Sequence, residues 1–194
     1  MSPIVKLQNG TLRDEIRQPI YDTVEIAAAV SPIGSNDFFS NVQAKNRWQT
    51  NLRQNNMLDT ANSFRVQGIA MDAMNQYSAN EQVIPTIMHY SSARFRVGEK
   101  DYWDGPMRFL AGRIDSAYAT SAAEYVHQKF GAPAVQPVIF EGRHVIDIAP
   151  LQSFRVTWTC EDMTAAEIAL ATAAADTSTL MMCSLKGLLR RPVQ

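Results

Sequence analysis

Large apolar residues alternate with polar residues most strictly in the run FRVTWTC, at positions 154–160. Side chains of a β-strand point to opposite faces in turn, with a period of two residues. The run therefore predicts a strand that is buried on one face and polar on the other. The predicted core residues are Phe154, Val156, Trp158 and Cys160.

The same alternation recurs along the chain in segments of strand length. Further strands are predicted at 24–30, 63–71, 93–97, 137–140, 144–148 and 180–189. Within 63–71, Gly68 allows a bulge, after which the apolar pattern continues out of phase. Turn-forming residues predict turns at 31–36 and 102–106, and a hairpin turn at 141–143. Many short strands separated by such turns indicate a β-sandwich or a barrel.

Two segments have helical patterns, and one long segment is ambiguous. Residues 115–130 place aromatic and alanine side chains at helical spacing, and 164–175 form an alanine-rich run that begins with a Thr-x-x-Glu capping box. The ambiguous segment is 37–58, whose amide-rich stretch 43–56 carries Trp48 and Leu52 four residues apart, which suits a short amphipathic helix. An ordered loop accounts better for its many Asn and Gln side chains, so a loop is favoured.

The composition is that of an ordinary globular domain. The chain has 194 residues, of which 46% are hydrophobic and 19% are charged. Its formal net charge of −1 gives no bulk attraction to nucleic acid or to anionic lipid. Arg190 and Arg191 are adjacent, and a solvated chain end is favoured over a basic patch. No apolar stretch approaches the roughly 20 residues of a membrane-spanning helix, so no membrane span is predicted.

Residues that carry metal or thiol chemistry are few and scattered. His89, His127 and His144 each lack a second ligand two or four positions away, so each is interpreted as structural. Cys160 and Cys183 lie in apolar strand-like runs and are interpreted as buried thiols. A disulfide between them requires Cα atoms roughly 4.4–6.8 Å apart, which leaves their pairing open.

One acidic cluster lies beside an aromatic pair. Glu99, Asp101 and Asp104 are carboxylates of the kind that serve as general acid and base, but a solvated loop is favoured for them. Tyr102 and Trp103 suggest a sugar-stacking or partner-binding patch. Neither a Gly-x-Ser-x-Gly elbow nor a glycine-rich phosphate loop is present in the sequence. No catalytic, cofactor-binding or metal-binding residue is therefore assigned, and no cofactor is predicted.

Aromatic and basic residues also interleave at Arg94-Phe95-Arg96 and at Phe154-Arg155. A surface for single-stranded nucleic acid needs both kinds of side chain on one sheet face. Strict alternation instead places the phenylalanines and the arginines on opposite faces. The phenylalanines are therefore predicted to lie in the core.

Several short segments carry a resemblance to a known family: Phe38-Phe39-Ser40, Thr50-Asn51-Leu52, Met57-Leu58, Ser63 to Ile69, Ile148 to Val156, and Leu185 to Gln194. In this order they resemble single jelly-roll capsid proteins, which form the shells of tailless icosahedral bacteriophages. The resemblance is one of layout and spans most of the chain. It implies an eight-stranded double sheet, self-assembly and no enzyme activity.

The chain is expected to divide into an arm and one domain. Residues 1–19 mix charged and amide side chains with few large apolar ones, so they are interpreted as an N-terminal arm or an edge segment and not as core. Residues 20–194 are expected to form a single jelly-roll domain of about eight strands. The helical segments at 115–130 and 164–175 are then two short insertions into an all-β fold.

For function, the resemblance implies a structural protein that self-assembles into an icosahedral virus shell enclosing the genome, in a virion assembled in the host cytoplasm. The expected partners are copies of itself in capsomers, other capsid components and, through weak contact, packaged nucleic acid. The near-neutral charge and the amide-rich stretch 43–56 suit contacts between many copies. The basic groups available for a genome are Arg13, Arg17, Arg190 and Arg191.

Two other classes of protein stay open. One is a carbohydrate- or ligand-binding β-sandwich module, with Tyr102 and Trp103 in its contact patch. The other is a β-sandwich enzyme whose catalytic acids lie far apart in the sequence. The size of the particles in solution separates a shell protein from both.

Overall fold

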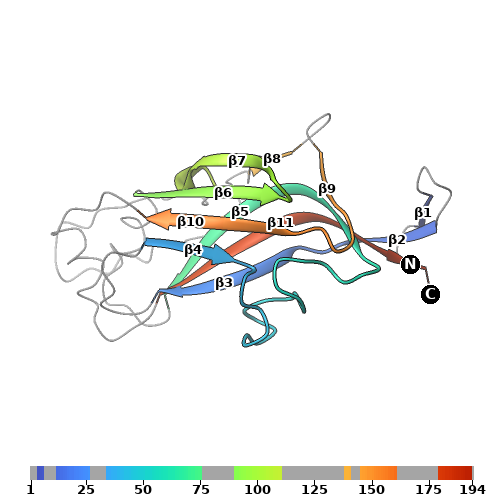
Figure 1. Ribbon diagram of the computed structural model, residues 1–194, viewed down its shortest axis with the longest axis horizontal. Helices are drawn as coiled ribbons and strands as arrows, with labels where there is room; N and C mark the ends of the chain where they lie inside the picture. Colours follow the sequence, from blue (N-terminus) through green and yellow to red (C-terminus); the bar gives the residue numbers. More distant parts are fainter. Residues whose placement is uncertain are drawn as a thin grey trace, which may run out of the picture.

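The alternating segments form strands, and the strands pair into two antiparallel sheets packed face to face (Figure 1). This arrangement confirms the predicted all-β sandwich. The computed structural model describes residues 4–6, 12–26, 34–75, 90–110, 138–140, 145–160 and 179–193. The elements in these residues are β1 (Ile4–Lys6), β2 (Leu12–Arg17), β3 (Ile20–Ile26), β4 (Gly34–Phe38), β5 (Ser63–Asn75), β6 (Ser91–Val97), β7 (Lys100–Pro106), the 3-10 helix η1 (Met107–Phe109), β8 (Val138–Ile139), β9 (Ile146–Ile148), β10 (Phe154–Cys160) and β11 (Thr179–Pro192).

The larger sheet is built on the long antiparallel pair of β5 and β11. One edge of β11 pairs first with β3 and then with β2, and β1 pairs with β2 beyond it. Pro19 lies between β2 and β3, where its missing N–H interrupts the ladder. The outer edge of β5 pairs with β8 and then with β9. β11 and β5 are therefore the central strands of this sheet.

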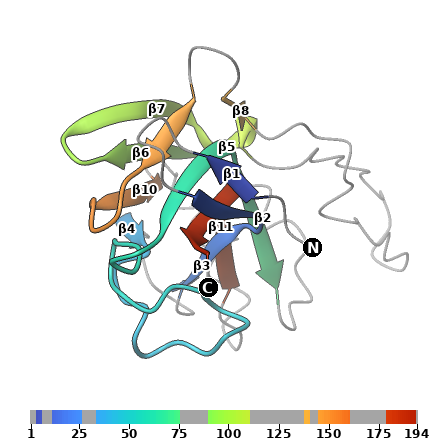
Figure 2. The same cartoon turned by 90° about the vertical axis from the view of Figure 1, so that its right-hand side faces the viewer.

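The smaller sheet has the strand order β4-β10-β6-β7. β6 and β7 form a hairpin whose turn contains Gly98 at φ +57°, a left-handed conformation that favours glycine. Along the sequence the chain crosses repeatedly between the two sheets. β3, β5, β8, β9 and β11 belong to the larger sheet, and β4, β6, β7 and β10 belong to the smaller one. The end-on view shows the two layers side by side (Figure 2).

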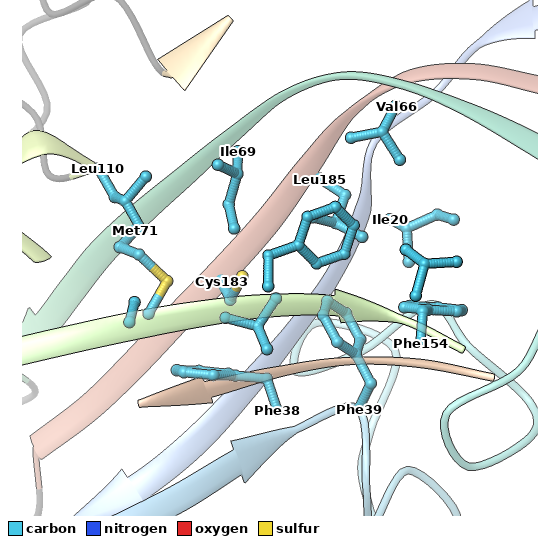
Figure 3. Packing of buried hydrophobic residues seen from close by; sticks show 14 of the residues in the cluster. Ile20, Phe38, Phe39, Val66, Ile69, Met71, Leu110, Phe154, Cys183 and Leu185 are labelled. Atoms are coloured by element: carbon cyan, nitrogen blue, oxygen red, sulfur yellow. The ribbon is translucent and has the colours of Figure 1, made fainter. Parts of the chain in front are cut away.

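The core lies between the sheets and takes inward side chains from both (Figure 3). The pattern of burial along β10 and along β6 alternates as predicted. The predicted core residues Phe154, Val156, Trp158 and Cys160 are all buried, and so is Phe95. The Phe39 and Phe154 rings meet in the core with their centroids 5.3 Å apart.

The bulge predicted at Gly68 is present. Lys186 lies opposite Gly68 while Gly187 lies opposite Val66, so Gln67 has no residue directly opposite it on β11. Because of this extra residue, Val66 and Ile69 both face the core although they are three positions apart.

Two predicted turns are wrong, because they are strands. Residues 34–36, the described part of the turn predicted at 31–36, lie in β4, and 102–106 lie in β7. Each of these strands lies at an edge of the smaller sheet. An edge strand tolerates Gly, Pro and charged residues because one of its sides has no ladder to complete. The Gly, Pro and polar residues that predicted turns in these two segments therefore belong to the edge strands of the smaller sheet.

The pairing predicted between the strands on either side of 141–143 is also wrong, and the turn residues themselves lie outside the described residues. β8 and β9 both pair antiparallel with β5, so they run in the same direction along one edge of it. The described residues hold eleven strands, against about eight expected. β2 and β3 share one edge of β11, and β8 and β9 share one edge of β5. With each of these two pairs counted as one position and β1 left out, the eleven strands occupy eight positions. The helices predicted at 115–130 and 164–175 lie outside the described residues.

Candidate functional site

The long loop between β4 and β5 is held to β3 by a buried ion pair. Asp22 lies on the inward face of β3 and is fully buried. Its carboxylate accepts hydrogen bonds from the Phe39 N–H, at 2.6 Å, and from Lys45 Nζ, at 2.8 and 2.9 Å. The Phe39 backbone adopts φ +68°, which is unusual for a bulky residue. The Asp22 carboxylate therefore fixes the turn that leads from β4 into the loop.

Amide side chains fix the rest of the loop. The Asn51 side-chain carbonyl accepts from the Tyr21 N–H at 3.0 Å, and its NH₂ donates to the Pro19 carbonyl at 2.7 Å. The Asn55 side chain likewise accepts from the Val42 N–H at 3.0 Å. These bonds confirm the ordered loop and exclude the amphipathic helix that was the alternative for this stretch.

The loop presents an exposed aromatic side chain. Trp48 is 48% exposed, while the neighbouring Arg47 carbonyl accepts a 2.5 Å hydrogen bond from the Tyr21 hydroxyl. A large aromatic on a backbone that is already ordered loses little conformational freedom when a partner covers it. Trp48 therefore has the properties of an interface anchor.

Charged side chains form cross-strand pairs on the outer face of the smaller sheet. Arg94 pairs with Asp104 at 2.9 Å, and Arg96 pairs with Asp101 through contacts of 2.6 and 3.0 Å. The hydrogen bond from Arg96 lowers the pKa of the Asp101 carboxyl below its ordinary value. Each aspartate thus faces an arginine of β6. For Asp101, a lowered pKa is the opposite of the raised pKa that a carboxylic general acid needs.

The aromatic pair predicted beside these acids is divided between two environments. Trp103 is half-buried and packs against the core, and it lies opposite Phe95. Tyr102 is partly exposed, and the Lys100 ammonium lies 4.8 Å from the centre of its ring. The two rings therefore do not form the joint stacking platform that the sequence suggested.

A network of four charged residues crosses the outer face of the larger sheet. Arg190 contacts Glu15 at 2.8 Å and Asp147 at 3.7 Å, and Asp147 also pairs with Arg65 at 2.9 Å. These side chains come from β2, β11, β9 and β5, so the network ties four strands together.

Three of the four arginines predicted to be available to a genome have partners within the chain. Arg190 is almost fully buried in the network, Arg191 pairs with Asp14 at 3.1 Å, and Arg13 donates to the Ala61 carbonyl at 2.7 Å. Arg17 is exposed.

Both cysteines are buried and neither is in a disulfide, which confirms the prediction of buried thiols. Burial raises the pKa of the Cys183 thiol well above its ordinary value, and the nearby Asp22 carboxylate adds to the shift. His89, His127 and His144 lie outside the described residues. Within the described ranges, no group of three or more potential metal ligands occurs.

The buried Asp22–Lys45 pair was missed by the sequence reasoning. The signal for it is an acidic residue on the inward face of a strand, two positions after Ile20. That acid interrupts the apolar pattern, which is why the first strand was predicted to begin at Val24 and not at Ile20. A search for charged residues on apolar faces would have detected it.

No helix among the described residues is long and apolar enough to cross a membrane. Comparison of the chain with protein-family models, curated proteins and solved structures finds no match. The fold and these surfaces define the class of the protein as an all-β sandwich.

Proposed function

We propose that this chain is a structural protein that assembles with copies of itself into an icosahedral virus shell. The observation that carries the proposal is the strand order. Eight strand positions divide into β2/β3-β11-β5-β8/β9 and β4-β10-β6-β7, and the chain alternates between them. A double sheet of two four-position layers is expected of a jelly roll, a fold that occurs in viral capsid domains, and therefore supports the proposal.

The surface supports contacts between many copies. The loop from 39 to 62 is fixed to β3 and presents Trp48, a residue type enriched where interfaces bury most of their energy. The formal net charge of −1 limits repulsion between identical subunits. Other exposed large apolar side chains are Leu12, Phe109, Ile139, Leu151 and Val193. Of these, Leu12, Leu151 and Val193 are available to capsomer contacts and to other shell components.

The alternative is a carbohydrate- or ligand-binding sandwich, because lectins and viral capsids share jelly-roll folds. Its expected contact patch is weakened by the position of Trp103 against the core. A catalytic role is not part of the proposal, since Asp101 and Asp104 are each tied to an arginine.

Sedimentation velocity and negative-stain microscopy test the proposal directly. The purified protein, studied over a range of concentrations and salt, is expected to form capsomers or closed shells. Trp48→Ser should shift the distribution toward smaller species, whereas Trp48→Phe, which keeps an aromatic anchor, should assemble like the wild type. A wild-type protein that stays monomeric under every condition would refute the proposal.

A further inference from the structure

A groove of about 850 Å³ lies on the larger sheet, where β11 and β5 pair around the bulge. This volume falls within the range of small-molecule sites, roughly 300–1,000 Å³. Its rim and floor come from β2, β11, β5 and β8 and from neighbouring residues such as Phe140 and Val145. The groove is therefore formed by elements from distant parts of the sequence.

Three cationic side chains surround the groove. Leu188 lies opposite Arg17 on one side and opposite Arg65 on the other. Lys186 projects from the same face of β11, two positions before Leu188. Residues in these relations have Cβ atoms roughly 4.5–8 Å apart. The register thus places three positive charges around one apolar side chain.

The positive charge of this rim is only partly compensated. Asp147 pairs with Arg65 through contacts of 2.9 and 3.2 Å. Neither Arg17 nor Lys186 has an ion pair with any residue that the structure describes, and both are exposed. On the outer face of the smaller sheet, by contrast, Arg94 and Arg96 each face an aspartate. The rim therefore favours an anion.

The middle of the groove is apolar and open. Gly68, opposite Lys186, has no side chain to fill the space. Leu188, Ile139 and Val145 line it with apolar atoms, and Ile139 is 44% exposed. An occupant that matches both parts carries an anionic group at one end and an apolar or aromatic body at the other.

We propose that this groove binds an organic phosphate such as a nucleotide. The phosphate contacts Arg17, Arg65 and Lys186, whose guanidinium and ammonium groups match phosphate oxygens in charge and hydrogen bonding. The base lies against Leu188 and Ile139. The nucleotide is either free or part of a single strand. The inference goes beyond shell formation, because an isolated subunit already contains the whole site.

Competition binding with the full chain tests the proposal. Fluorescein-labelled AMP is the probe, and unlabelled AMP, adenosine and inorganic phosphate are the competitors. AMP is expected to compete at least about tenfold better than either of the others, because only AMP fills both parts of the groove. Arg17→Gln and Lys186→Gln should each weaken AMP binding about tenfold, as expected for the loss of a charged hydrogen bond. Arg94→Gln, an exposed arginine on the other sheet, should leave it unchanged.

A second arm distinguishes the two sources of nucleotide. If a labelled octathymidylate binds more tightly than AMP, the logarithm of its affinity should fall with the logarithm of salt by about 0.7 per phosphate contacted. Arg17→Gln should then reduce that slope by about 0.7, because it removes one phosphate contact. If AMP binds as tightly as the octathymidylate, the free nucleotide is the ligand.

Several outcomes overturn the inference. They are the absence of AMP binding, equal competition by inorganic phosphate, and equal loss of binding in Arg94→Gln. Circular dichroism and thermal unfolding of every variant show whether the fold is kept. Leu188→Asn leaves the charge unchanged and should weaken the binding of AMP but not that of inorganic phosphate. Sedimentation of the same samples separates this inference from the proposed function, since a monomer that binds AMP refutes only the shell.

Discussion

The buried pair of Asp22 and Lys45 allows a prediction in which a second substitution restores stability lost in the first. Asp22 is fully buried, and the Lys45 side chain is 17% exposed. Lys45→Met keeps the apolar stem but leaves a buried carboxylate without its counter-charge. We expect a loss of about 3–5 kcal/mol in the free energy of unfolding, the usual cost of removing one partner of a buried ion pair.

Asp22→Asn, added to Lys45→Met, should recover part of that loss. In the wild type, the Phe39 N–H donates to the Asp22 carboxylate at 2.6 Å. The neutral amide of the variant still offers an oxygen to this N–H. Because no unpaired charge remains, the double variant should lose only about 1–2 kcal/mol relative to the wild type, the cost of an imperfect hydrogen bond. Asp22→Asn alone should fall between these values, since Lys45 can turn its ammonium group toward water.

Urea unfolding followed by far-ultraviolet circular dichroism measures these free energies, with an unchanged dependence on urea as the sign of two-state behaviour. The exposed pair of Arg94 and Asp104 provides the matched control, with side chains 51% and 53% exposed. Its variants Arg94→Met and Asp104→Asn should each change stability by less than about 1 kcal/mol. If the two substitutions at Asp22 and Lys45 add to within about 0.5 kcal/mol, the reasoning is refuted.

Three further predictions rest on single buried positions. Gly187→Ala should lower the free energy of unfolding in urea by about 3 kcal/mol or more, because the added Cβ would lie 2.0 Å from the Arg65 carbonyl oxygen. The control Gly105→Ala should cost much less, because its Cβ would lie 3.3 Å from the nearest atom. Cys183 should resist thiol reagents until the protein unfolds. The free energy of unfolding should fall above about pH 8.5, because the thiol ionises in the unfolded chain before it does in the folded one. This fall should be smaller in Cys183→Ala than in the wild type. Trp158→Phe removes a buried indole N–H that has no hydrogen-bond partner in the described part of the chain, so thermal unfolding should show a cost below the roughly 3–5 kcal/mol of a Trp→Ala change.

The central strands were the part of the fold that the sequence could predict. β10 and β6 are buried on one face and polar on the other, so apolar and polar residues alternate along β10 and along β6 from Ser92 to Val97. Gly68 marked the bulge in β5 because a glycine inside a strand has no side chain to pack and often lies where the ladder is interrupted. Edge strands lack this constraint. Within the described residues, β4 and β7 pair on one side only, and their sequences are as polar as those of turns.

The candidate sites depended on register, which no local pattern contains. Arg190 meets Glu15 across 175 positions, and Arg65 meets Asp147 across 82. The groove arises because the register places Arg17, Leu188 and Arg65 in one row. The sequence therefore showed the basic residues individually, but not which of them had acidic partners. Asp22 was missed for a different, local reason. A charged residue on the inward face of a strand interrupts the apolar pattern, so it was interpreted as lying outside the strand.

The positions of β10 and β11 in the chain bear on how the protein is synthesised. β10 lies between β4 and β6, and β11 lies between β5 and the β2/β3 edge. Both are later in the sequence than the strands that they join. A ribosome therefore delivers β3 to β9 before either sheet can be completed, and the nascent chain carries strands with unpaired edges during that time.

Contacts across such long sequence separations also form slowly, because the intervening chain must first be closed into a loop. The nascent chain would need protection from neighbouring nascent chains on the same messenger until β11 has been made. The larger sheet can therefore close only after β11 has left the ribosome, so the fold is completed after the synthesis of this strand.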